Sequence, residues 1–133
     1  MVEKLVKWEP IVNLANKYSI EYVSDDFDEF KVLLCEVSSN KKMWMRFESA
    51  IGSYRRINKC FQESNSYKLY EKYEAASGAE WTFFTVDNSS YIQWLSEESY
   101  AWSDYRSFIH FSIVASDSIL DIAVGLNPTF ELI

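Results

Sequence analysis

The sequence predicts an α+β domain in which one mostly antiparallel, mixed β-sheet is covered by three to four helices. Hydrophobic residues make up 48% of the chain, which has only three glycines and two prolines, so a packed core is expected. Runs with the two-residue alternation of strands come first, and runs with helical spacing are interleaved with strands later. The length of 133 residues suits a single domain over residues 1–133.

The first half is expected to hold a short helix followed by strands. Apolar residues near helical spacing between Val2 and Ala15 predict a helix that Pro10 interrupts. Alternating or β-rich runs then predict strands at Tyr18–Val23, Phe30–Val37 and Lys41–Glu48, the last two forming a hairpin. Residues Tyr54–Asn58 either extend the sheet or lead away from it.

The second half is expected to interleave helices and strands. A capping box of Ser90 and Gln93 predicts the start of a helix that runs to Leu95 or beyond. Asp117 or Ser118 is expected to cap another short helix. The helices are predicted at Ser64–Ala76, Ser90–Leu95 and Ile119–Val124, and the strands at Trp81–Val86, Phe108–Ala115 and Thr129–Ile133.

Charge is distributed unevenly along the chain. Residues 74–133 carry nine carboxylates and one base, Arg106, whereas residues 1–73 carry eleven acids and twelve bases. The net charge of −7 therefore comes entirely from the second part. A field of one sign attracts a basic partner and repels nucleic acid and anionic lipid. We therefore expect a basic protein partner, no nucleic acid and no membrane.

The residues of common catalytic and cofactor sites are scarce. His110 is the only histidine, and it lies mid-strand, where a packed or hydrogen-bonded role is more usual than catalysis. Cys35 and Cys60 are separated, so with one histidine they do not predict a zinc site. The three isolated glycines form no phosphate-binding loop. The sequence predicts no catalytic residue, no metal and no cofactor.

The segment from Asp87 to Arg106 combines carboxylates with aromatic residues. Interface hot spots pair rigid aromatic side chains with a polar rim, and charges of one sign steer the approach of the partner. Helical periodicity places Trp94 and Leu95 in the core. The predicted partner-binding residues are Asp87, Glu97, Glu98 and Asp104 for charge, with Tyr100 and Trp102 as anchors.

A small basic group is formed by Arg46, Arg55, Arg56 and Lys59. With Trp44 and Tyr54 nearby, it could form a patch for phosphate or RNA. It could also be a positively charged sheet edge, which discourages edge-to-edge pairing and is the interpretation we favour. A third alternative is that these bases bridge to the acidic half of the chain.

The chain has no apolar leader at its N-terminus and no stretch of about 20 apolar residues that could span a membrane. With only two cysteines, these features are typical of a cytoplasmic protein with reduced thiols. We therefore expect a cytoplasmic location.

Two stretches resemble a known group of proteins. Residues Phe47–Asn58 contain a strand followed by the pattern S-Y-R-x-x-N, and residues Trp81–Leu95 contain a strand followed by N-S and Y-I-x-W. Together they resemble small cytosolic immunity proteins encoded beside bacterial polymorphic or contact-dependent toxins. The resemblance implies a non-catalytic, high-affinity partner of a toxin domain.

Three functional hypotheses follow. The first is an immunity protein that neutralises a cognate toxin, plausibly a basic nuclease, through its acidic and aromatic surface. The second is a phage-encoded inhibitor that mimics nucleic acid to block a host defence enzyme. The third is a small-molecule-binding or enzymatic domain with a pocket formed by Tyr91, Trp94 and His110. The oligomeric state is not predicted.

Overall fold

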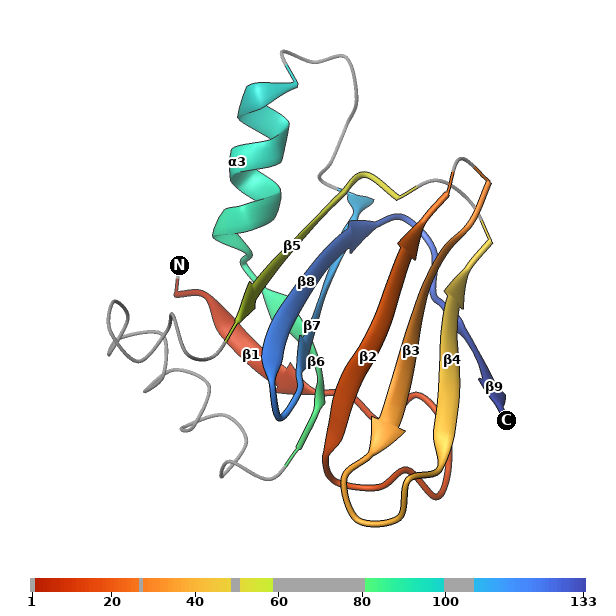
Figure 1. The fold of residues 1–133 in the computed structure, drawn as a ribbon. Helices are drawn as coiled ribbons and strands as arrows, with labels where there is room; N and C mark the ends of the chain where they lie inside the picture. Colours follow the sequence, from red (N-terminus) through yellow and green to blue (C-terminus); the bar gives the residue numbers. More distant parts are fainter. Residues whose placement is uncertain (1, 27, 49–50, 59–80, 100–106) are drawn as a thin grey trace.

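The computed structural model describes residues 2–26, 28–48, 51–58, 81–99 and 107–133. Within these ranges, nine strands form two antiparallel sheets, and a single helix accompanies them (Figure 1). No helix in these ranges is long and apolar enough to cross a membrane.

The larger sheet has five strands in the order β1-β6-β7-β8-β5. These strands are β1 (Lys4–Lys7), β6 (Phe83–Asp87), β7 (Ile109–Val114), β8 (Ser118–Val124) and β5 (Ser53–Asn58). The smaller sheet has the order β2-β3-β4-β9. Its strands are β2 (Tyr18–Asp25), β3 (Phe30–Glu36), β4 (Lys42–Phe47) and β9 (Thr129–Leu132).

The main core lies between the two sheets. On β3, Phe30, Val32 and Leu34 alternate with more exposed residues and are fully buried, as a strand with one core-facing side requires. They belong to the same buried cluster as Phe111 and Ile113 of β7. Two sheets whose apolar faces meet in this way form a sandwich.

The helix α3 (Ser90–Glu98) lies on the side of the larger sheet that faces away from the smaller one (Figure 1). Tyr91 and Leu95 are buried in a second small cluster with Ala123 of β8, against which Ile92 and Phe108 pack. The larger sheet is therefore covered on both faces at β8, by the smaller sheet and by α3.

The predicted α+β architecture, one sheet under three to four helices, is wrong. The described residues are mostly β, and they form two antiparallel sheets with one helix. Of the helices expected from the sequence, Ser90–Leu95 is confirmed as part of α3, whereas Val2–Ala15 and Ile119–Val124 are not helical. The expected helix at 64–76 lies outside the described residues.

The expected helix at Ile119–Val124 is the strand β8, and all seven residues of that strand are buried. A strand covered on both faces is apolar throughout and loses the alternation that identifies half-buried strands. The helix was expected because Asp117 or Ser118 could cap it, but Ser118 is the first residue of the strand, and Asp121 within the run is buried too. The β-branched residues Ile119, Ile122 and Val124 suit the strand.

The expected helix over Val2–Ala15 is replaced by the short edge strand β1, in which Leu5 pairs with Val86 of β6. Four residues are too few to show an alternation, and the pairing partner is distant in sequence. The other strand predictions are confirmed, including a buried side of Met43, Met45 and Phe47 on β4. Residues Tyr54–Asn58 do extend a sheet, as the edge strand β5.

Candidate functional site

Helix α3 begins at a serine that also contacts the sheet. Ser89 is the N-cap, and its hydroxyl oxygen accepts a hydrogen bond of 3.1 Å from the backbone amide of Ile92. The same hydroxyl lies 2.7 Å from Nδ1 of His110 on β7. The predicted capping box of Ser90 and Gln93 is therefore wrong, because the N-cap is Ser89 and the side chain of Gln93 bonds to Glu97. Instead, the Ser90 amide donates to the carboxylate of Glu3, across 3.3 Å.

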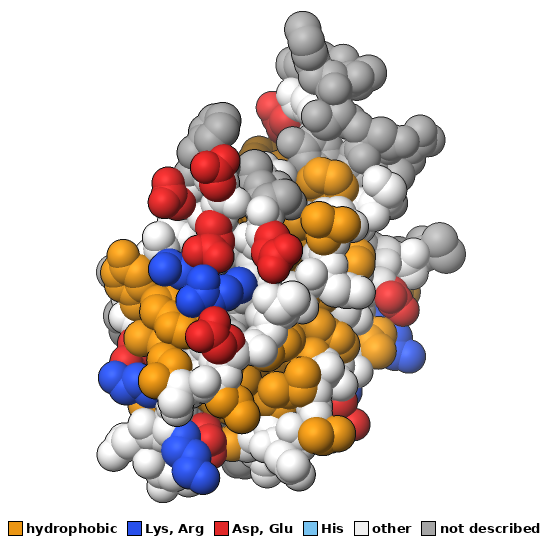
Figure 2. Space-filling model, turned by 90° about the vertical axis from the view of Figure 1, so that its right-hand side faces the viewer, with side chains coloured by type: hydrophobic (Ala, Val, Ile, Leu, Met, Phe, Trp, Pro, Cys, Tyr) orange, Lys and Arg blue, Asp and Glu red, His pale blue; other side chains and the backbone are white. Residues whose placement is uncertain are grey.

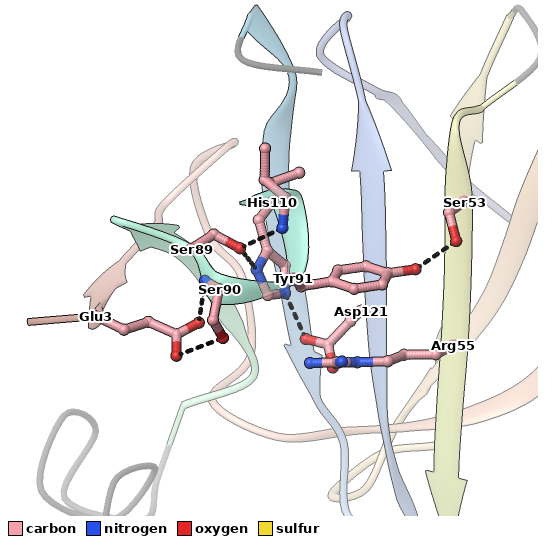
Figure 3. A network of polar contacts seen from close by, with 9 residues as sticks. Glu3, Ser53, Arg55, Ser89, Ser90, Tyr91, His110 and Asp121 are labelled. Atoms are coloured by element: carbon pink, nitrogen blue, oxygen red, sulfur yellow. Dashed lines mark hydrogen bonds and ion pairs between the residues drawn. The ribbon is translucent and has the colours of Figure 1, made fainter. Parts of the chain in front are cut away.

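A polar network, buried at His110 and Asp121, continues from this cap into the sheet (Figure 3). Nε2 of His110 lies 2.7 Å from Oδ1 of Asp121, and Nε of Arg55 donates to Oδ2 of the same carboxylate across 3.0 Å. An ionised carboxylate only accepts hydrogen bonds, so the imidazole carries a proton on Nε2. The other ring nitrogen, Nδ1, faces the hydroxyl of Ser89. The network links α3, β7, β8 and β5.

The carboxyl group of Asp121 is held in its charged form. Its side chain is 3% exposed, and burial by itself favours the neutral acid. The hydrogen bond and charge of His110, together with the guanidinium of Arg55, outweigh that cost and lower the pKa of Asp121 below its ordinary value of 3.8. The position of His110 on the strand, packed and hydrogen-bonded, agrees with the sequence expectation.

Tyr91 holds Trp94, the exposed aromatic residue of α3, in place. Its hydroxyl lies 2.6 Å from the hydroxyl of Ser53, and the guanidinium of Arg55 stands 4.2 Å from the centre of its ring. Trp94 stacks on Tyr91 with a centroid distance of 6.3 Å and an interplanar angle of 14°. Trp94 is nevertheless 52% exposed, so the expectation that it lies in the core is wrong, whereas Leu95 is buried as expected.

An open hollow of about 720 Å³ lies beside α3, between the helix and the end of β6. We call it the α3 hollow. It brings together Asp87 and Glu97, two of the predicted partner-binding residues, and Glu98 is exposed next to Glu97. The other predicted binding residues lie outside the described part of the chain: Tyr100, Trp102 and Asp104. The lining consists of Val86, Asp87, Asn88, Ser89, Ile92, Gln93, Ser96, Glu97 and Phe108.

The basic group bridges to the acidic half of the chain. Arg55 pairs with Asp121 at 3.0 Å, and Arg56 lies 3.6 Å from Asp117. Both arginines lie on the edge strand β5, so the expected charged sheet edge and the expected bridging are present for these two residues, whereas Arg46 lies on the inner strand β4. Lys59 lies outside the described residues.

Arg46 on β4 makes the corresponding contact in the smaller sheet. It lies 3.1 Å from Glu131 of β9 and 3.1 Å from Glu29. On the face of the molecule shown in Figure 2, basic side chains likewise lie directly beside carboxylates. Each of the three described guanidinium groups of the basic group therefore lies beside a carboxylate.

The pairing leaves a localised excess of negative charge. Of the six acidic residues described between 81 and 133, Asp117, Asp121 and Glu131 are paired with arginines of the first half. The other three are Asp87, Glu97 and Glu98, which have no ion pair with any described residue. We call these three residues the acidic patch. Among the described residues from 81 to 133, the carboxylates without an ion pair therefore lie at α3 and the end of β6.

Ser89, His110 and Asp121 contain the residue types of a hydrolase triad, and their hydrogen bonds could relay a proton. However, the Ser89 oxygen is already used as the helix cap, and the imidazole is buried. Of the three residues from which a pocket was expected, Trp94 is half exposed. Tyr91 and His110 are buried and their rings contact each other at 5.3 Å. No group of potential metal ligands is found among the described residues.

Comparisons with models of protein families, with curated proteins and with solved structures give no match for this chain.

Proposed function

We propose that this chain is a non-catalytic, cytoplasmic inhibitor that binds a basic protein, most simply a bacterial toxin domain, in the manner of an immunity protein. The acidic patch carries the proposal. Three of the six acids described between 81 and 133 are neutralised by arginines, and the three that are not lie at α3 and the adjoining end of β6. A localised field of this kind accelerates the encounter with a basic partner.

The exposed side chain of Trp94 on α3 supports the same function. Trp94 is half exposed and lies three and four residues before Glu97 and Glu98, on the same side of the helix. Its ring is held by Tyr91, which is itself fixed by Ser53 and Arg55. An aromatic side chain that is ordered before binding loses little entropy on association, which favours a tight interface.

The polar network supports binding rather than catalysis. Ser89 and His110 anchor the first turn of α3 to the sheet. Because the helix is fixed in this way, it can present the acidic patch and Trp94 in one arrangement. Preorganisation of this type lowers the cost of forming a complex.

The test begins with a tagged pull-down from the source cells at low and then high salt, followed by mass spectrometry. We expect one stoichiometric basic protein, whose capture weakens as the salt concentration rises. The association rate is then measured for the double reversal Glu97→Lys and Glu98→Lys. Its matched control reverses Asp25 and Asp28, two exposed acids on the smaller-sheet side of the chain.

Reversal in the acidic patch should slow association by about tenfold or more at low salt and flatten the salt dependence. The control changes the net charge by the same amount and should have a much smaller effect. Equal association rates for the wild type and the Glu97/Glu98 variant across the salt series would contradict the proposal. Capture of several nucleic-acid enzymes instead of one toxin would favour the phage-encoded mimic.

A further inference from the structure

The α3 hollow combines negative charge with apolar walls. Asp87 and Glu97 contribute the carboxylates, while Val86, Ile92 and Phe108 contribute apolar surface. An arginine side chain has the matching parts, because its apolar stem covers hydrophobic surface and its planar guanidinium donates two hydrogen bonds to one carboxylate. A guanidinium also stacks on aromatic rings such as that of Phe108.

The end of α3 carries charges that oppose its own dipole. Glu97 and Glu98 lie in its last turn, which contains no basic residue, although the C-terminus of a helix favours cations. The side-chain amide of Gln93 donates to Glu97 across 3.4 Å, but this bond brings no positive charge. A cation bound at Glu97 would satisfy the carboxylate and the negative end of the helix together.

The wall of the hollow also contains an unpaired polar group. The hydroxyl oxygen of Ser96 is buried and has no hydrogen-bond partner among the described residues. Ser96 lines the α3 hollow one residue before Glu97. A hydroxyl in this lining that has no partner among the described residues is a candidate acceptor for a donor bound in the hollow.

We propose that the α3 hollow receives an arginine side chain of the partner protein, an inference that rests on the proposed function. The guanidinium binds Glu97, with Asp87 as the second carboxylate, and the stem lies along Ile92 and Phe108. Arginine is preferred to lysine because a planar fork matches a carboxylate and an aromatic wall at the same time, whereas an ammonium group is a strongly hydrated point charge.

The experiment titrates the full chain with N-acetyl-arginine amide and follows the backbone amide resonances of Ile92, Gln93 and Glu97 by NMR. We expect saturable shifts with a Kd on the order of 1 mM, as for a ligand of this size. N-acetyl-citrulline amide has nearly the same shape without the charge, and it should bind at least about tenfold more weakly. Equal binding of citrulline amide or of N-acetyl-lysine amide, or an absence of saturable shifts, would overturn the proposal.

Two neighbouring variants localise the binding. Glu97 lines the α3 hollow, whereas Glu98 has the same charge but is not part of the lining. Glu97→Gln should raise the Kd of N-acetyl-arginine amide about tenfold, and Glu98→Gln should raise it by no more than about twofold. Equal losses in both variants would show general attraction and no defined site. This titration needs no partner protein. If arginine amide does not bind but a toxin is captured in a salt-dependent way, the proposed function stands and only the arginine site is rejected. If arginine amide binds but no basic protein is captured, the proposed function is rejected.

Discussion

The hydroxyl of Ser89 lies 2.7 Å from Nδ1 of His110, and this contact joins the first turn of α3 to the central strand of the larger sheet. Ser89 also caps the helix, so a single hydroxyl serves both the helix and the sheet. Behind it, His110 and Asp121 continue the network into the buried interior.

The first prediction concerns the cap. Ser89→Ala removes both hydrogen bonds of the hydroxyl and should lower the free energy of unfolding by about 2 kcal/mol, measured by urea denaturation. Ser90→Ala is the matched control. Its hydroxyl bonds only to Glu3 at an exposed position, so the loss should stay within about 0.5 kcal/mol. A larger loss for Ser90→Ala than for Ser89→Ala would show that the helix begins one residue later.

The second prediction concerns pH. The folded pKa of Asp121 is lowered, so the stability that its ionisation contributes is complete above its ordinary value of 3.8. That contribution is lost as the pH falls through the lowered folded value. Urea midpoints measured across acidic pH should therefore fall more steeply for the wild type than for Asp121→Asn, which has no carboxyl group to titrate. Parallel pH profiles for the two proteins would contradict this role of Asp121.

The third prediction compares two arginines on β5. Arg55→Met leaves the buried carboxylate of Asp121 without its guanidinium partner and should cost roughly 1–3 kcal/mol of unfolding free energy. Arg56→Met removes a contact with Asp117, whose side chain is 43% exposed, and should cost less than about 1 kcal/mol. The two variants lose the same charge, so a difference between their denaturation curves reports the burial of the partner. Equal costs would mean that His110 alone is enough to stabilise the buried carboxylate of Asp121.

The fourth prediction separates folding from binding on α3. Leu95→Ala removes a buried side chain and should destabilise the chain by at least about 2 kcal/mol. Trp94→Ala removes a half-exposed ring and should change stability less. If Trp94 is an interface anchor, the same variant should bind the captured partner with an affinity lower by about tenfold or more. Thermal melting and binding measured on the same two proteins provide the check. Unchanged affinity of Trp94→Ala would remove the aromatic part of the proposed interface.

The sequence determined the strands in which only one face is buried. On β4, Met43, Met45 and Phe47 alternate with Trp44 and Arg46, and this pattern by itself indicates a half-buried strand. It also determined the imbalance of charge between the two parts of the chain, since that is a matter of counting residues. Asp87 and Glu97 were predicted as partner-binding residues from the acidic and aromatic segment between Asp87 and Arg106, and both line the α3 hollow.

The features that depend on contacts between residues far apart in the chain became visible only in the tertiary structure. β8 is covered on both faces, so apolar and polar residues do not alternate along it, and the sequence pattern did not indicate a strand. The bonds from Ser53 to Tyr91 and from Glu3 to Ser90 join segments far apart in the chain, and no local pattern signals them. The pairing of arginines with Asp117, Asp121 and Glu131 likewise arises only in the folded chain, and among the described acids of residues 81–133 it leaves the acidic patch without an ion pair.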